Sequence, residues 1–292
     1  MCSFKEEIDD AELRATEIVM DSSLSVLLEG DCDELLYGKF LDENCCKIEV
    51  MDGKENVVEV MEFINQKKPT AAIAIIDADL DYIQDIKYSE NIFLTDSHDA
   101  DTEMFLSDAF YRVAKEFYSK NKAGTIDELK RIQNTIIDIE IPMACLRIYD
   151  KEKQLNFAFK PNSDDEKSFP YGKFIDSDKN QLNHKGVKTM VKIACSYDSD
   201  QGRGMNQNEI VDGVNEIIKR DYPANHIIHG HDLMHILSLS LKRYGKKNKQ
   251  NRNNEDWESS FRLAYSKTEF ENTKLYGKLK DYSIDSEIPF LL

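Results

Sequence analysis

The first 120 residues alternate between short apolar runs and longer stretches in which apolar residues recur at helical spacing. The apolar runs predict buried strands, and the periodic stretches predict amphipathic helices. An alternation of this kind indicates a parallel sheet covered by helices on both faces, so the predicted fold class is α/β. The predicted strands are Leu24–Leu28, Cys46–Val50, Ala71–Ile76 and Ile92–Thr95. The predicted helices are Asp10–Met20, Asp31–Leu41, Glu55–Gln66 and Thr102–Ser119.

The pattern changes after about residue 122. Thr125 and Glu128 have the spacing of a capping box, which predicts a helix that begins there and reaches Ile136. Later segments predict strands at Ala144–Tyr149 and Lys188–Ser196, a polar loop at Lys160–Lys167, helices at Asn208–Lys219, Asp232–Tyr244 and Glu255–Lys280, and a flexible basic loop at Lys246–Asn254. We therefore expect a catalytic core at residues 1–122 and a mixed α+β, mainly helical accessory region at residues 123–292.

Composition narrows the class of protein. The 292 residues include 55 acidic and 38 basic side chains, which give a net charge of −17 and exclude a uniformly basic nucleic-acid coat. The longest apolar run, Ala71–Ile76, is far shorter than the roughly 18 residues that a membrane span needs. Six scattered cysteines without a C-x-x-C pair suit reduced thiols. We expect a cytoplasmic protein with no membrane contact.

Acidic residues follow three of the predicted strands, and the third of these groups is Asp96 to Glu103 after Ile92–Thr95. Glu29 comes directly after Leu28, and the segment Asp77-Ala78-Asp79-Leu80-Asp81 comes directly after Ile76. Ligands of parallel sheets bind beyond the carboxyl ends of the strands, and alternation on an extended segment places Asp77 and Asp79 on one side. Such oxygen-rich sites suit Mg²⁺, with Mn²⁺ as a substitute. Two such ions could hold the attacking and leaving oxygens of a phosphodiester.

Three other interpretations of the D-x-D-x-D segment stay open. An EF-hand loop would need glycine at its sixth position and glutamate at its twelfth, where this chain has Tyr82 and Tyr88. A phosphatase with an aspartyl nucleophile would carry D-x-D-x-T, and Asp81 stands in place of the threonine. A purely structural acidic loop or helix cap is also compatible, because Asp is common where helices begin.

The two strand-end segments, Val26–Asp33 and Ile75–Asp79, resemble a Toprim domain, the fold of topoisomerases, primases and OLD-family nucleases. Its signature is a glutamate at the end of one strand and D-x-D at the end of a later one. The run Asn91–Asp99, followed by Glu103, resembles one Toprim-like family, the AriB-type effector nucleases of the PARIS anti-phage system. The Toprim resemblance covers roughly residues 20–110, and a weaker family likeness extends to about residue 245.

The resemblance implies a Mg²⁺-dependent nuclease that acts as a toxic defence effector. It implies tRNA as the substrate, an ABC-type, AriA-like ATPase scaffold that holds the effector inactive, and a homodimer on release. By position, Glu29 matches the Toprim glutamate, a metal ligand or general base, and Asp77 and Asp79 match the metal-binding pair. Asp33 and Glu103 fit further acidic metal-binding positions.

Four histidines, at positions 226, 229, 231 and 235, fall within ten residues. His231 and His235 have the i, i+4 spacing that can bind zinc on a helix, but H-E-x-x-H is absent. Histidines with a purely structural role are a second interpretation. A third is an auxiliary catalytic site, because related OLD-type nucleases place a basic residue near the metals and His231 fits that position. A cation there could neutralise charge on a pentavalent phosphorus transition state.

Basic residues are concentrated after the histidine cluster, with no acidic residue between Asp232 and Glu255. This local reversal of charge predicts contact with a nucleic-acid backbone, with a solvated loop or docking to an acidic partner as alternatives. The candidate nucleic-acid-binding residues are Lys242, Arg243, Lys246, Lys247, Lys249 and Arg252.

Three functions follow from these features. The leading one is a metal-dependent endonuclease with Glu29, Asp77, Asp79 and His231 as catalytic residues, cleaving RNA and, through the resemblance, tRNA. The second is a DNA-nicking Toprim nuclease, since both nucleic acids present phosphates. The third is a non-catalytic adaptor or sensor that keeps the fold and binds an ATPase partner.

Overall fold

The chain divides into two compact units in a computed structural model, which describes residues 10–157, 159, 169–183, 185–197, 206–247 and 252–292. The first unit combines Met1–Ala100 with Ser266–Leu292, and the second is Asp101–Tyr265. This division differs from the boundary expected near residue 122. The segment 101–122 belongs to the second unit, where Phe117 packs edge-on against Trp257 at 5.0 Å between ring centroids.

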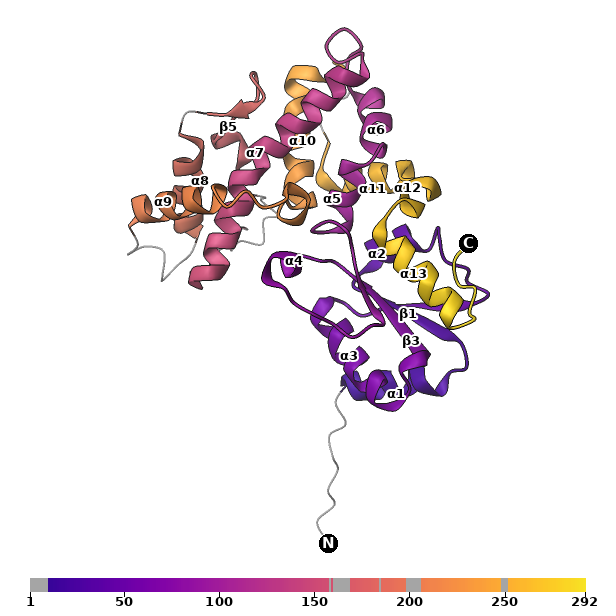
Figure 1. The fold of residues 1–292 in the computed structure, drawn as a ribbon. Coiled ribbons are helices and arrows are strands. Elements are labelled where there is room, and N and C mark those ends of the chain that lie inside the picture. Colours follow the sequence, from indigo (N-terminus) through magenta and orange to yellow (C-terminus); the bar gives the residue numbers. More distant parts are fainter. Residues whose placement is uncertain (1–9, 158, 160–168, 184, 198–205, 248–251) are drawn as a thin grey trace. The chain divides into compact units, whose positions relative to one another are not determined.

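The sheet of the first unit has four parallel strands in the order β2-β1-β3-β4 (Figure 1). These strands are β1 (Leu24–Leu28), β2 (Cys46–Val50), β3 (Ala72–Ile76) and β4 (Ile92–Leu94). Every residue of β1 and β3 is buried, as expected of central strands covered on both faces. The predicted α/β class, a parallel sheet flanked by helices with a mainly helical C-terminal half, is confirmed.

Helices of the first unit pack on the two faces of this sheet. The helical elements of this unit are α1 (Asp10–Met20), α2 (Asp31–Tyr37), α3 (Lys54–Lys67), η1 (Pro69–Ala71), α4 (Asp81–Gln84), α12 (Lys267–Glu271) and α13 (Lys274–Asp285). One core cluster joins α1 and α3 to sheet residues that include the paired Ala74 and Ile92. The next pair along, Ile75 and Phe93, points to the opposite face, where Phe93 meets Tyr282 of α13.

Asp96 joins the end of β4 to the beginning of α13. Its two carboxylate oxygens accept hydrogen bonds from the backbone N–H groups of Lys274, at 2.5 Å, and Leu275, at 3.0 Å. These amides belong to the first turn of the helix, which has no intrahelical acceptors for them and carries partial positive charge. Asp96 follows a strand, as Glu29 and Asp77 do, but its carboxylate caps the first turn of α13.

Asp96→Ala is expected to lower the free energy of unfolding by about 1–2 kcal/mol, because it removes a charged cap from two helix amides. Urea denaturation followed by circular dichroism measures the change. Asp281→Ala, on the same helix and away from its first turn, is the control. An Asp96→Ala protein as stable as the control would mean that water serves these amides equally well.

Two predicted helices of the first half end or break earlier than expected. The helix predicted at Asp31–Leu41 ends at Tyr37, and Leu41 instead forms an antiparallel bridge with Leu291. The helix predicted at Thr102–Ser119 is two helices, α5 (Ala100–Leu106) and α6 (Ala109–Phe117). Ser107 separates them, since its hydroxyl donates to the Met104 carbonyl and accepts from the Ala109 amide.

The second unit is built around one long helix, α7 (Ile126–Lys153). The predicted capping box of Thr125 and Glu128 begins it, but it continues well beyond Ile136 and passes through Pro142. The other elements are α8 (Gly186–Tyr197), α9 (Gln207–Ile218), α10 (Gly230–Tyr244), α11 (Asn254–Ala264), the short turns η2 (Tyr171–Lys173) and η4 (Ala224–His226), and a small antiparallel pair, β5 (Ile175–Asp176) and β6 (Gln181–Leu182).

Two strand predictions in this unit were wrong. Ala144–Tyr149 lies within α7 and Lys188–Ser196 lies within α8. Both segments are apolar runs buried within a helical unit, and a short apolar run has no period that separates a buried helix from a buried strand. The helix predicted at Glu255–Lys280 is divided into α11, α12 and α13. The polar loop predicted at Lys160–Lys167 lies outside the described residues.

In the part of the chain that the structure describes, no helix is both long enough and apolar enough to cross a bilayer.

Candidate functional site

The carboxyl ends of β1 and β3 bring the predicted acidic residues together. Leu28 pairs with Ile75, so Glu29 and Asp77 leave adjacent parallel strands at the same edge. An oxygen of Glu29, Oε1, accepts a hydrogen bond from the backbone N–H of Asp77 at 2.8 Å. One oxygen of Asp77, Oδ1, accepts from the N–H of Ala100 at 3.1 Å. The sheet register therefore places the glutamate beside the D-x-D segment, as the sequence predicted.

The two carboxyl groups hold their protons unusually well. Burial, together with the charges of Asp33 and Asp79, raises the pKa of Glu29 to about 7, against the opposing effects of its hydrogen bond from Asp77 and of Lys54. Burial raises the pKa of Asp77 well above its usual value, and the carboxylates of Asp99, Asp33, Glu29 and Asp79 add to this. Burial and neighbouring carboxylates thus disfavour the charged forms of Glu29 and Asp77, and a cation bound here would favour them, which makes this part of the edge a candidate cation site.

The backbone of the D-x-D segment is held in an uncommon conformation. Asp79 has φ of 47°, in the left-handed region that L-residues seldom adopt. Its N–H donates to the carbonyl oxygen of His98 at 2.7 Å, and its own carbonyl oxygen lies 2.7 Å from Nδ1 of His98. A carbonyl oxygen only accepts, so Nδ1 of His98 carries the proton. This reciprocal pair with buried His98 keeps Asp79 in its strained conformation.

Asp79→Ala is expected to unfold about 1 kcal/mol more easily than Asp79→Asn. Both variants remove the charge, but asparagine tolerates the left-handed region and alanine does not. Chemical denaturation of the two variants gives the difference directly, with the pair Asp85→Ala and Asp85→Asn as a reference, since Asp85 has φ of 54°. Equal stabilities of the Asp79 variants would contradict the conformational argument.

Lys54, the first residue of α3, is a member of the site that the sequence did not predict. Its ammonium nitrogen Nζ donates to Oδ2 of Asp79 at 2.8 Å, to Oδ2 of Asp81 at 2.7 Å and to the carbonyl oxygen of Asp77 at 2.7 Å. Its side chain is only 15% exposed. Burial lowers the pKa of Lys54, but the bonds to Asp79 and Asp81 outweigh this and raise it above its usual value.

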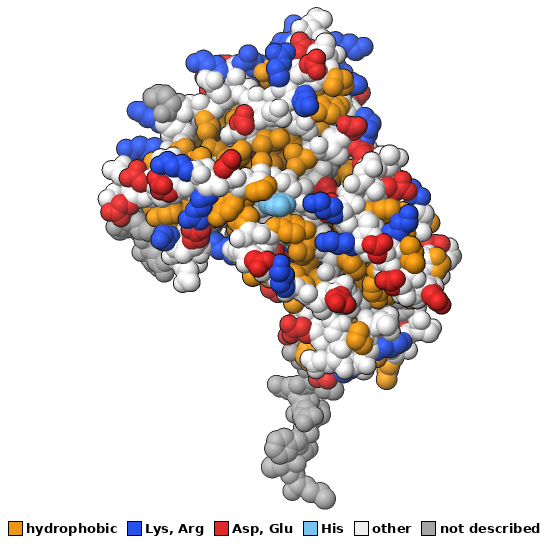
Figure 2. Space-filling model, viewed as in Figure 1, with side chains coloured by type: hydrophobic (Ala, Val, Ile, Leu, Met, Phe, Trp, Pro, Cys, Tyr) orange, Lys and Arg blue, Asp and Glu red, His pale blue; other side chains and the backbone are white. Residues whose placement is uncertain are grey.

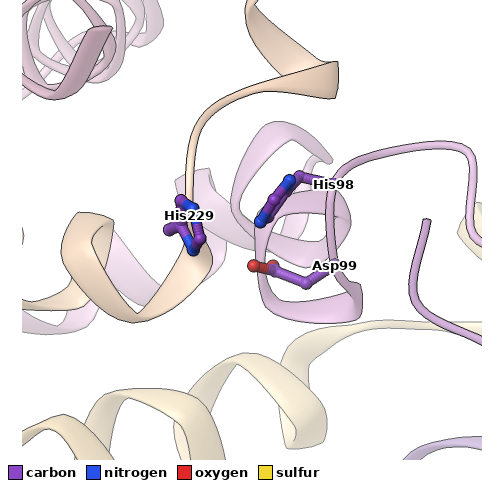
Figure 3. Close-up of side chains that lie close together, drawn as sticks. All are labelled: His98, Asp99 and His229. Atoms are coloured by element: carbon purple, nitrogen blue, oxygen red, sulfur yellow. The ribbon is translucent and has the colours of Figure 1, made fainter. Parts of the chain in front are cut away.

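The acidic residues of the first unit do not form a closed set of metal ligands. Within its described residues, no three ligand atoms of His, Cys, Asp or Glu all lie within 4.8 Å of one another. His98 and Asp99, which follow β4, have ligand atoms within that distance of each other. Figure 3 shows the side chains of His98 and Asp99. A cation at this edge would have to draw Glu29, Asp77 and Asp79 closer together.

The two weaker acidic candidates have other contacts as well. Asp33 lies in the first turn of α2, and its Oδ2 accepts from the N–H of Gly30 at 3.0 Å. It still contributes to the charge around Glu29 and Asp77. Glu103 belongs to α5 in the second unit, where its Oε1 accepts from the hydroxyl of Tyr265 at 3.0 Å. The metal-binding role predicted for each residue stays a prediction.

The histidine candidates lie on the first turns of α10. His231 is exposed, and its Nδ1 lies 3.4 Å from Oε1 of Glu258. His235 stacks on Tyr171, and its ring meets that of His231 edge-on at 4.9 Å between centroids. Burial, followed by the charge of His231, lowers the pKa of His235 to about 4, so it is neutral at physiological pH. Among the described residues of the second unit, no three potential metal ligands come within 4.8 Å of one another.

Several of the predicted nucleic-acid-binding residues have structural contacts. Arg252 lies over the rings of Phe117, at 4.1 Å, and Trp257, at 5.0 Å. Lys246 donates to the carbonyl oxygens of Lys115 and Glu116, and Arg243 donates to that of Asp178. Lys242 and Lys247 are exposed, and Lys249 lies outside the described residues.

Charge is mixed on the part of the surface that can be seen. Figure 2 shows Lys and Arg side chains interspersed with Asp and Glu over the face in view, without a large patch of one sign. A long basic groove of the kind that follows a nucleic-acid backbone is not visible on this face.

Comparison with known proteins adds no relative. No protein-family model matches the chain, and a search of curated proteins found no match.

Sequence reasoning missed Lys54, His98 and Asp99 as members of the site. His98 and Asp99 fall in the polar run after β4, which the sequence singles out as a strand-end cluster without giving either residue a role. Lys54 follows Gly53, whose N–H donates to the carbonyl oxygen of Glu29. This contact and the three bonds of Lys54 place the beginning of α3 at the acidic edge, and no motif in the sequence predicts them.

Proposed function

We propose that the carboxyl edge of the sheet is the active site of a metal-dependent phosphodiesterase, a Toprim-like endonuclease. The observation that supports this most is the bond from the Asp77 N–H to Glu29, which places a glutamate beside a D-x-D segment at the ends of two adjacent parallel strands. The raised pKa values of Glu29 and Asp77 support it too, because clustered carboxyl groups with perturbed pKa values are typical of functional sites.

The donor set suits a hard divalent cation. Glu29, Asp77 and Asp79 offer carboxylate oxygens, the ligands that Mg²⁺ and Mn²⁺ prefer. Binding such a cation would offset the burial and the neighbouring carboxylates that together raise the pKa of Asp77. When bound, the ion would offset negative charge on the phosphodiester oxygens. The charges of Asp99 and Asp33 also act on the carboxyl group of Asp77.

Each residue of the edge has a role in this proposal. Glu29 lies beside the D-x-D segment through its hydrogen bond from the Asp77 N–H, where it would hold the cation or accept a proton from the attacking water. Asp77 and Asp79 hold the cation, and Lys54 and His98 keep Asp79 in position. His231 and the exposed Lys242 and Lys247 would contact the substrate backbone, in keeping with their charge and exposure.

The substrate and partners come from the resemblance to AriB-type effectors. We propose RNA, specifically tRNA, as the substrate, an ABC-type ATPase as the inhibitory scaffold, and a homodimer as the active form. A tRNA substrate places the protein in the cytoplasm.

The test is a nuclease assay with purified wild type and Asp77→Asn on tRNA and on duplex DNA. Each reaction is run with Mg²⁺, with Mn²⁺ and with EDTA. We expect cleavage of tRNA that needs the metal and is lost in Asp77→Asn. Metal-dependent cleavage of DNA alone would support the DNA-nicking alternative. Equal activity of Asp77→Asn and wild type would place the active site elsewhere.

A non-catalytic adaptor is the second candidate, and the Lys54 contacts favour it. Because Lys54 already forms ion pairs with Asp79 and Asp81, part of the negative charge of the acidic edge is balanced without a metal ion. The adaptor predicts no cleavage of either nucleic acid, together with binding to an ATPase partner that Asp77→Asn leaves intact. Pull-down of the partner by both proteins, alongside the nuclease assay, separates the two functions.

A further inference from the structure

The ammonium group of Lys54 is saturated by three oxygens of one short segment. It has three N–H donors, and the three acceptors, from Asp77, Asp79 and Asp81, lie 2.7–2.8 Å away. Asp81 is buried, and its Oδ2 also accepts from the hydroxyl of Tyr88 at 2.8 Å. The charge of Lys54 is therefore directed at the Asp79–Asp81 side of the acidic edge.

The position of this lysine is costly for the helix that carries it. Lys54 is the first residue of α3, where the helix has partial positive charge that disfavours a cation. Its side chain is also largely withdrawn from water, which disfavours a charged group unless it is paired. The two ion pairs with Asp79 and Asp81 offset both costs, so the contacts of Lys54 belong to the acidic edge and not to the stability of the helix.

We propose that the ammonium group of Lys54 is a permanent second cation of the acidic edge, so that the edge binds one divalent metal ion per chain instead of two. The divalent ion is held on the Glu29–Asp77 side. This inference rests on the proposed function, because it specifies the cations of that same site.

The distribution of charge along the edge supports this division. Asp79 and Asp81 each have an ion pair with Lys54, at 2.8 and 2.7 Å. Glu29 and Asp77 accept backbone hydrogen bonds but make no ion pair in the described structure. The remaining need for positive charge is therefore on the Glu29–Asp77 side, where one divalent ion would meet it.

A fixed ammonium also changes what the site requires. A second metal ion would exchange with solution and would have to be bound anew, whereas Lys54 is tethered to α3 and is always present. Asp79 is 47% exposed, so it can contribute to a metal ion while it remains bonded to Lys54 through Oδ2.

The experiment counts bound Mn²⁺ by the loss of the free-ion signal in electron paramagnetic resonance, at physiological salt and without nucleic acid. Wild type, Lys54→Met and Lys67→Met are compared. Lys67 lies at the other end of α3 in an exposed ion pair with Glu12, so its replacement removes one surface charge and leaves the edge intact. A double variant, Glu29→Gln with Asp77→Asn, measures the binding of Mn²⁺ elsewhere on this acidic protein.

We expect one Mn²⁺ at the edge in wild type and in Lys67→Met, and two in Lys54→Met, because Asp79 and Asp81 become available. Two ions in wild type, or one ion in a folded Lys54→Met protein, would overturn this inference and leave the proposed function standing. No ion above the level of the double variant would remove the proposed function as well. If Lys54→Met does not fold, Lys54→Gln takes its place with the same expected count, since it also removes the positive charge but keeps a polar side chain at this position.

Discussion

Glu29→Gln is expected to lower the rate of metal-dependent cleavage by at least about 100-fold and to make the metal-free protein more stable at pH 8. The loss of activity follows because glutamine neither accepts a proton nor carries the charge that binds a cation. The fold should be unharmed, because the amide oxygen can still accept the hydrogen bond from the Asp77 N–H. Activity and stability are therefore expected to change in opposite directions, as is common at strained functional sites.

The gain in stability depends on pH, and its sign follows from the raised pKa of Glu29. The folded protein keeps this proton up to about pH 7, whereas the unfolded chain releases it near the usual value of 4.5. Wild type is therefore destabilised as pH rises from 4.5 to 7, and the penalty is fully present above pH 7. A shift of this size corresponds to roughly 3 kcal/mol at pH 8 and about 1 kcal/mol at pH 5.5. Relief of the repulsion on Asp77 has the same sign.

Urea denaturation in EDTA, at pH 5.5 and at pH 8, measures this difference. Glu59→Gln is the matched control, because Glu59 is an exposed residue of α3 and the substitution changes the net charge equally. We expect Glu29→Gln to be more stable than the control at both pH values and by more at pH 8. A Glu29→Gln protein that is less stable than wild type would mean that its loss of activity reflects damage to the fold.

The sheet could be predicted from the sequence because its signals are local. The strands β1, β3 and β4 are largely apolar runs of three to five residues, β2 alternates apolar and charged residues, and acidic residues follow β1 and β3 directly. Because the carboxyl ends of parallel strands lie at the same edge of a sheet, Glu29 and Asp77 can be placed at one edge from the sequence alone. The C-terminal part of the first unit could not be predicted in this way, because Phe270 stacks on Phe40 across more than 200 residues of sequence.

The acidic residues of the site could be predicted from the sequence, but its cation, Lys54, could not. A strand followed by Asp or Glu is a pattern that can be read along the chain, but the partner of Asp79 and Asp81 comes from the beginning of another helix. The buried pair of Arg147 and Asp232 was missed for the same reason, since α7 and α10 contribute one residue each. Ion pairs between distant segments are determined by how the segments pack, and no periodic pattern in the sequence predicts them.

Asp232→Ala is expected to be the most destabilising single substitution in the second unit. Asp232 is 1% exposed. It accepts three hydrogen bonds from the guanidinium group of Arg147, at 2.9–3.1 Å, and another from the hydroxyl of Tyr171. Burial lowers the pKa of Arg147, but the charge of Asp232 outweighs this and raises it. Removing Asp232 would leave a largely buried guanidinium unpaired, at a cost of about 3–5 kcal/mol.

The stability lost in Asp232→Ala comes from leaving the charge of Arg147 unpaired, and not from losing the attraction between the two side chains. Arg147→Met combined with Asp232→Ala should therefore be more stable than Asp232→Ala alone, because neither charge is then buried without a partner. Glu216→Gln breaks an exposed pair with Lys219 and should change the free energy of unfolding by less than about 0.5 kcal/mol. Urea denaturation of the four proteins completes the comparison. If Asp232→Ala costs no more than Glu216→Gln, water must reach Arg147, and the burial of this pair would not be what holds α10 against α7.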